Sequence, residues 1–178
     1  VCSSDLRPLR DYLRYAFHDD GDGARARAEE HLARIALDHA EPHEGPRGRV
    51  APADAITALG ALVTMGNLEG AARVAARLDA QSPAALATET GVRALDRLVE
   101  ELENEDRAVA TSVTLVARAR AHQTRGRLDL ATADLTRAKS LAKRAGDPHA
   151  QGLADQRLAS IRTDGGDPRA GKKLAEKA

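Results

Sequence analysis

The residues whose types and spacing come closest to a chemical site are two histidines, His39 and His43. On one face of a helix, two histidines four residues apart can bind zinc with help from nearby carboxylates. The carboxylates available here are Asp38, Glu41 and Glu44. Pro42 lies between the histidines and is expected to end the helix, because proline lacks a backbone N–H and clashes with the preceding turn. We therefore expect a solvated linker and no metal site.

Other residue types that could carry chemistry lack partners. His122 falls on the inward side of its expected helix, but the sequence places no serine, cysteine or carboxylate to pair with it as a general base would require. The DDGDG stretch at residues 19–23 lacks the spacing and the terminal glutamate of a calcium loop. It also lacks the Lys-Ser/Thr ending of a phosphate loop. We therefore expect no catalytic residues and no cofactor.

Composition excludes several classes of function. The formal net charge at pH 7 is +0, which argues neither for nucleic acid nor for a membrane surface as a partner. Aromatic residues make up 2% of the chain, too few for the stacking platforms of single-strand nucleic-acid binders. No apolar run approaches the roughly 18 residues that span a bilayer. We expect a soluble, cytoplasmic protein.

The elements that would have to position any site are helices. β-branched residues are sparse and apolar residues do not alternate with polar ones, so no strand is expected. About nine segments instead carry apolar residues at helical spacing. The expected organisation is a helix pair over 7–40, a linker over 41–52 that contains three prolines and two glycines, and a helical array over 53–178.

Within the array, each expected helix has its own apolar stripe. The third helix carries Ala55, Ile56, Leu59, Leu62 and Val63, and the fourth carries Leu68, Ala71, Ala75 and Leu78. The fifth opens at Ser82-Pro83 and carries Val92, Leu95, Leu98, Val99 and Leu102. The sixth carries Val109, Val113 and Val116, and the seventh carries Leu128, Ala131, Leu135, Ala138 and Leu141. The eighth and ninth open at Asp147-Pro148 and Asp167-Pro168, where an acidic cap precedes a first-turn proline.

Four turns share a spacing in which glycine is followed five residues later by alanine: GDGARA, GNLEGA, GRLDLA and GGDPRA. A shift of 39 residues carries Gly126, Ala131 and Leu135 onto Gly165, Ala170 and Leu174. The pattern resembles the tetratricopeptide repeat family, whose helix pairs have a turn glycine, a small residue five on, a bulky one four further and often a closing proline such as Pro83. The resemblance covers 53–83 and 112–178, and more weakly 7–40. The family's large rings are missing, since Ala75, Leu135 and Leu174 stand at those positions.

The resemblance implies an all-α fold in which antiparallel helix pairs stack as a short solenoid. The physical reason is that a helix pair with one apolar stripe per helix buries that stripe only against its neighbours. A compact helical bundle without repeat symmetry is the alternative fold.

The resemblance also implies a non-catalytic scaffold for protein–protein interaction, whose partner is a protein or peptide. The alternatives are a sensor or regulatory region of a transcriptional regulator or signalling ATPase whose effector domain lies upstream, and a helical enzyme. In the family the first helix of each pair lines a concave groove. Carried over from Gly126 and Gly165, that register predicts six groove residues: Arg120, Gln123, Thr124, Asp155, Gln156 and Arg162.

Charge is unevenly distributed along the chain. Residues 83–106 carry seven acidic against two basic side chains, a net charge of −5, whereas residues 137–178 carry a net charge of +5. The two segments are expected to attract one another or to bind a charged partner.

The first six residues, VCSSDL, differ from the rest of the chain. They contain the only cysteine, Cys2, and a serine pair. Back-translated, they resemble the end of a common sequencing adapter over all six residues. We expect residues 1–6 to be non-native and the natural chain to continue a longer gene near Arg7.

Overall fold

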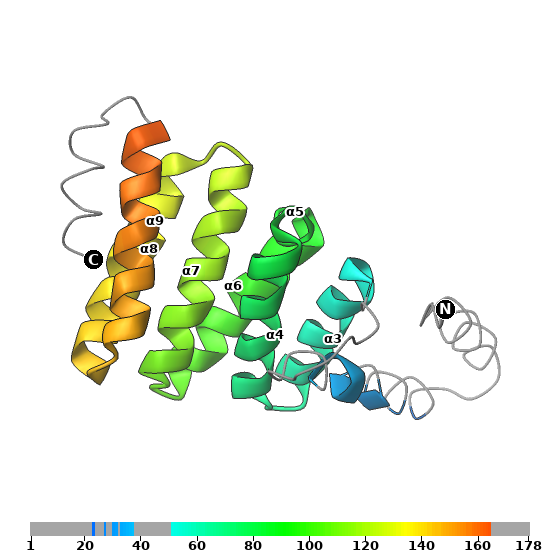
Figure 1. The fold of residues 1–178 in the computed structure, drawn as a ribbon. Coiled ribbons are helices and arrows are strands. Elements are labelled where there is room, and N and C mark those ends of the chain that lie inside the picture. The colour runs from blue at the N-terminus through cyan, green and yellow to red at the C-terminus, as the bar shows by residue number, and fades with distance from the viewer. Residues whose placement is uncertain (1–22, 24–26, 28–29, 32, 38–50, 165–178) are drawn as a thin grey trace, which may run out of the picture.

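A computed structural model describes residues 51–164 together with residues 23, 27, 30, 31 and 33–37. In this part of the chain every regular element is a helix and none is a strand, which confirms the all-α class. The helices with complete bounds are α3 (Pro52–Thr64), α4 (Leu68–Gln81), α5 (Pro83–Leu86), α6 (Glu89–Asn104), α7 (Ala108–Thr124), α8 (Leu128–Ala145) and α9 (Pro148–Asp164) (Figure 1). None of these helices combines the length and the apolar character that crossing a bilayer requires.

The helix starts expected between residues 51 and 164 are found, with one correction. The start expected at Asp167-Pro168 lies outside the described residues. α9 begins as predicted, since the side chain of Asp147 accepts a hydrogen bond from the backbone of Ala150 at 2.9 Å. The expected fifth helix is instead two helices, α5 and α6, which are separated by Ala87 and Thr88. Thr88 caps α6 by accepting from the backbone of Gly91 at 3.1 Å, a local signal that the uninterrupted apolar stripe concealed.

Four inter-helix turns have the same backbone conformation. Each contains one residue in the left-handed region, namely Gly66, Asp106, Gly126 and Gly146, with φ of 74°, 53°, 74° and 69°. In each turn the N–H of the next residue donates 2.9 Å to a carbonyl five residues back, the Schellman arrangement that closes a helix end. These residues lie 40, 20 and 20 positions apart, so the last three turns are evenly spaced and the first lies at twice that interval. The turns predicted at Gly21 and Gly165 lie outside the described residues.

The Asp106 turn is not among the four turns with the predicted glycine spacing, because it has no glycine. Aspartate is one of the few side chains that tolerate the left-handed region, through local hydrogen bonding. The rest of the repeat pattern is present, since Thr111 five residues on and Leu115 four further are 2% and 0% exposed. The helix pair that contains α6 and α7 therefore follows the same turn geometry as its neighbours.

The helices enclose two hydrophobic clusters, with α7 shared between them. The first cluster joins α3, α4, α5 and α6 with Ala117 and Ala121 of α7. The second joins α8 and α9 with Leu115, Val116 and Ala119 of α7, and with one residue of α6. α7 contacts α4, α5, α6, α8 and α9, and Figure 1 shows α4, α7 and α9 side by side. α7 is thus the one helix that contributes several residues to both clusters in the described part of the chain.

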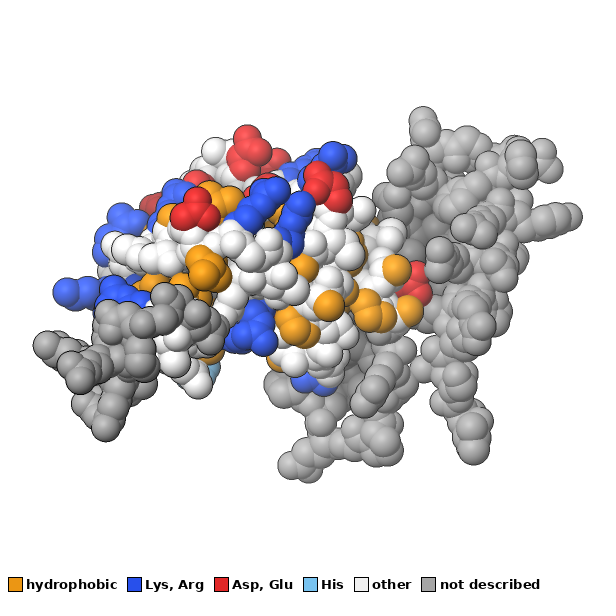
Figure 2. Space-filling view, turned by 90° about the horizontal axis from the view of Figure 1, so that it is seen from above, with side chains coloured by type: hydrophobic (Ala, Val, Ile, Leu, Met, Phe, Trp, Pro, Cys, Tyr) orange, Lys and Arg blue, Asp and Glu red, His pale blue; other side chains and the backbone are white. Residues whose placement is uncertain are grey.

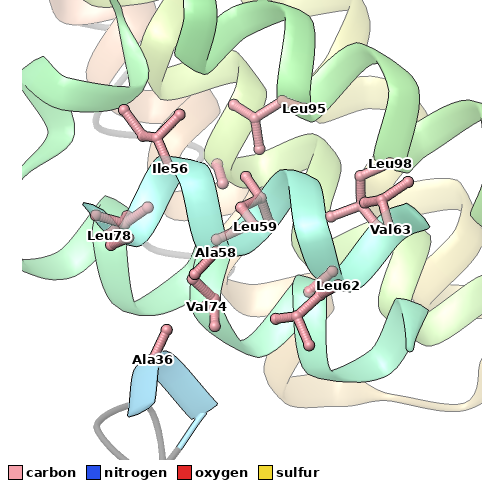
Figure 3. Packing of buried hydrophobic residues seen from close by; sticks show 14 of the residues in the cluster. Ala36, Ile56, Ala58, Leu59, Leu62, Val63, Val74, Leu78, Leu95 and Leu98 are labelled. Atoms are coloured by element: carbon pink, nitrogen blue, oxygen red, sulfur yellow. The ribbon is translucent and has the colours of Figure 1, made fainter. Parts of the chain in front are cut away.

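Residues of the N-terminal segment contribute to the first cluster. Ala33 and Ala36 are 1% and 4% exposed, and they pack against the core formed by α3 and α4. Figure 3 shows Ala36 on the side of α4 that carries Val74 and Leu78. The described part of the expected N-terminal helix pair therefore shares a core with α3 and α4, although the expected linker separates them in sequence.

Most predicted core positions are buried, but α7 is an exception. Ala131 and Leu135 of α8 are 0% and 1% exposed, as the repeat register predicted. On α7, by contrast, Val109 is exposed and Val113 is only half-buried. Of the three valines predicted on α7, Val116 is buried at 3% exposure, whereas the side that carries Val109 and Val113 is not covered by the neighbouring helices.

Candidate functional site

The side of α7 left free by its neighbours carries an exposed stripe. Val109, Val113, Arg120 and Thr124 are spaced by four, seven and four residues, which places them along one side of a helix. The stripe runs between Val116, which packs with α9, and Ala117, which packs with α4. Polar and apolar side chains therefore lie together on one surface, which is bordered by α4 and α9.

An ion pair joins the two bordering helices across α7. Arg157 of α9 donates to Asp79 of α4 at 2.9 Å, and the Asp79 side chain is 10% exposed. Burial raises the pKa of the Asp79 carboxyl above its ordinary value, although the charges of Arg157 and Arg120 act in the opposite direction. Oδ1 of Asp79 has no hydrogen-bond partner among the described residues. One carboxylate thus faces two arginines, and Arg120 makes no ion pair in the described part of the chain.

The structure brings together the predicted groove residues of α7. Arg120 and Gln123 are half-buried, and Thr124 is exposed. The hydroxyl of Thr124 donates to the carbonyl of Arg120 at 2.9 Å, so this hydroxyl already has an acceptor within its own helix. Arg120 and Thr124 lie on the exposed stripe.

The predicted groove residues of α9 do not all lie beside them. Asp155 is 4% exposed and accepts from Lys139 of α8 at 2.6 Å, so it faces α8. Arg162 follows Asp155 by seven residues, two helical turns, and therefore lies on the same side of α9. Arg157, which faces α4, is about 140° away from Arg162 around the helix axis. The structure groups Arg120 with Arg157 rather than with Arg162, while Gln156 is exposed.

A second polar cluster lies on the opposite side of α7, between α6 and α8. Arg118 donates to both oxygens of Asp134 at 2.8 and 2.6 Å, and to Asp96 at 3.0 Å. The Arg118 and Asp134 side chains are 16% and 10% exposed. Burial opposes the charge of Arg118, but its hydrogen bonds to Asp134 raise the pKa of the guanidinium above its ordinary value.

His122 belongs to this cluster, which corrects a prediction. We expected no carboxylate near it, yet Nε2 of His122 lies 3.8 Å from Oδ2 of Asp134. The distance exceeds hydrogen-bond range, and Asp134 already accepts two hydrogen bonds from Arg118. Nδ1 of His122 is buried without a hydrogen-bond partner among the described residues. No described residue therefore orients the ring through Nδ1 as the partner of a general base would. Asp134 follows His122 by twelve residues on another helix, so no local pattern could have paired them.

Acidic residues of α6 pair with arginines of α7 and α8. The ion pairs are Asp96 with Arg118 at 3.0 Å, Glu89 with Arg125 at 3.3 Å, and Glu103 with Arg137. Of these three pairs, only Glu103–Arg137 joins the predicted acidic and basic segments, because Arg118 and Arg125 precede residue 137. On the face shown in Figure 2, basic and acidic side chains alternate rather than separate into patches.

A cavity of about 550 Å³ lies at the other end of the array. Its lining includes Arg27, Arg34 and Glu30 beside the apolar side chains of Leu62 and Met65. Arg34 lies 3.0 Å from Nδ1 of His31, so its guanidinium already has an acceptor. The charged lining is mixed rather than of one sign.

The described residues contain no group of three or more side chains that could hold a metal ion. The histidine pair His39 and His43, and most of the DDGDG stretch, lie outside the described residues. Comparisons with protein-family models, with curated proteins and with solved structures find no match to the chain.

Proposed function

We propose that the chain is a non-catalytic scaffold that binds a protein segment on the surface formed by α4, α7 and α9. In this proposal the helices form antiparallel pairs that stack as a tetratricopeptide-like solenoid. The similar backbone of the four turns supports this arrangement, because similar turns repeat a similar helix-to-helix geometry.

The observation that carries the proposal is the exposed stripe of α7. Val109 is 46% exposed in a helix whose other sides are covered, and Arg120 on the same stripe makes no ion pair in the described part of the chain. An extended segment laid along α7 would cover the valines and offer acceptors to the guanidinium. The neighbouring Asp79–Arg157 pair would hold α4 and α9 at a constant separation beside it.

A binding screen tests the proposal. Tiled peptides from bacterial proteomes would be displayed against the intact chain, and the affinity of each recovered peptide would be measured by fluorescence polarisation. We expect Arg120→Glu to weaken these peptides at least tenfold, because the substitution reverses the only charge on the stripe. Val109→Ser should weaken them less, because it removes apolar contact area alone.

Arg144→Glu is the matched control, since Arg144 is exposed on α8 and lies away from the stripe. Circular dichroism would first establish that all three variants have equal helicity and melting temperature. Peptides that bind equally well to wild type and to Arg120→Glu would show that α7 is not the binding surface.

A further inference from the structure

A buried histidine stands at the junction through which α8 and α9 attach to the rest of the molecule. α8 contacts α7 and α9 and forms the Arg137–Glu103 ion pair with α6, while α9 reaches the first half of the array through α7 and the Arg157 side chain. His122 is 7% exposed, and it lies on the side of α7 that Asp134 of α8 approaches. Separation of α8 from α7 would therefore expose this imidazole to water.

The surroundings of His122 suit a neutral ring. Its Nδ1 has no partner among the described residues, so a proton added there would be a buried donor without an acceptor. Asp134 could stabilise an imidazolium, but both of its oxygens already accept from Arg118. A charged ring would have to compete with a bidentate guanidinium for the same carboxylate.

Four charged groups of the described residues act on the ring. Burial lowers the pKa of His122 below its ordinary value. Asp134 of α8 and Asp96 of α6 oppose that shift, while Arg118 of α7 and Arg127 of the following turn add to it. The closed junction therefore binds a proton at His122 less readily than a solvated imidazole does.

We propose that the junction between α7 and α8 is an acid-sensitive switch, in which protonation of His122 releases α8 and α9 together from α7. The open state has a solvated imidazole, which binds the proton more tightly than the buried one. Acid therefore shifts the equilibrium toward the open state. The two helices separate as a unit because the second hydrophobic cluster joins them to each other as well as to α7.

The sign of the effect separates His122 from the other group with a shifted pKa near α9. Asp79 has a raised pKa in the folded state, so its protonation stabilises that state as the pH falls. His122 has a lowered pKa in the folded state. The attachment of α8 and α9 to α7 therefore becomes less stable as the pH drops below about 6.5, the pKa of a solvated imidazole. An acid-induced opening of α8 and α9 cannot come from Asp79.

Hydrogen exchange of the intact chain tests the switch. Backbone amide exchange would be measured at pH 7.5, 6.5 and 5.5 and converted to opening constants with the intrinsic exchange rate at each pH. For amides of α8 and α9 we expect a several-fold rise in the opening constant, up to about tenfold, the maximum that one imidazole allows over this range. Amides of α3 and α4 should show no comparable rise.

His122→Gln should abolish the rise, because a carboxamide retains polar character but does not titrate. His149→Gln should retain it, since His149 is exposed on α9. Asp79→Asn should also retain it. Titration of the wild-type imidazoles by NMR needs no variant and should place the pKa of His122 below 6.5.

Three results with the wild-type chain would overturn the switch, and one with the His122→Gln variant would do the same. The first is an unchanged opening constant in α8 and α9, and the second is an equal rise in α3 and α4. The third is a His122 pKa at or above 6.5. Persistence of the rise in His122→Gln would assign it to another group and would equally reject the role of His122.

Discussion

The two halves of the array are stabilised by different kinds of contact. The first cluster contains the fully buried leucines Leu59, Leu62, Leu86, Leu95, Leu98 and Leu102. Among the described residues, every buried polar or charged residue lies instead in α7, α8 or α9: Thr111, Ser112, Thr114, His122, Asp134 and Asp155. Both halves therefore contain packed apolar side chains, but the second half adds buried polar groups and their hydrogen bonds.

The polar bonds of the second half join specific pairs of helices. Ser112 of α7 donates to the carbonyl of Ala138 of α8 at 3.0 Å, and Lys139 of α8 donates to Asp155 of α9 at 2.6 Å. Such bonds are directional, so they select one register between helices whose alanine surfaces could slide. We therefore expect acid to destabilise the second half more than the first, because its buried side chains include titratable groups.

The largest effect is expected from a charge without a partner in the second half. Ala131→Glu buries a carboxylate at a position that is 0% exposed, and it should reduce the free energy of unfolding by about 4 kcal/mol or prevent folding. Ala133→Glu is the control, because Ala133 is exposed on the same helix. Thermal melts would compare the two, and equal melting temperatures would contradict the register of α8.

Removing apolar volume from the first half should have the next largest effect. Leu95→Ala deletes a fully buried side chain of α6 and should cost about 3 kcal/mol, from lost burial and the cavity left behind. Because no titrating group is involved, the loss should be the same at pH 7.5 and 5.5. Urea unfolding at both pH values measures it, and a loss that varied with pH would weaken the contrast between the halves.

Asp134→Asn should cost about 2 kcal/mol, because it leaves the nearly buried Arg118 without its bidentate carboxylate. It should also lower the pKa of His122 further, since it removes the nearer of the two charges that favour the imidazolium. Urea unfolding and NMR titration measure the two effects. Asp129→Asn, at an exposed position of α8, should leave both nearly unchanged.

The smallest effect concerns the turns, which both halves share. Asp106→Gly should stabilise the protein by at most about 1 kcal/mol, because glycine adopts the left-handed backbone without steric cost. Gly126→Ala should destabilise it by about 1 kcal/mol for the same reason. Opposite shifts in melting temperature would confirm that the two turns are equivalent, and shifts of the same sign would contradict it.

The predicted register related residues within one helix but not between helices, and the groove itself stays a prediction. Arg120 and Thr124 share a side of α7 because helical periodicity alone relates residues four apart. Arg157 and Asp79 are 78 positions apart, and nothing in the local sequence indicates that they meet. Similarly, Val109 and Val113 were expected in the core, because hydrophobicity identifies apolar residues but not which side of a helix its neighbours cover.

Local sequence patterns predict the helical class, the positions of most turns and the apolar stripes of α3, α4, α6 and α8. Those features follow from local physics, namely glycine in left-handed turns, proline in first turns and apolar residues at helical spacing. Only the tertiary structure decided that α7 lies in two cores, that Asp134 approaches His122 and that Asp155 faces α8 rather than the α7 stripe. Contacts between helices depend on how each helix is rotated against its neighbours, and that rotation results from packing all of them at once.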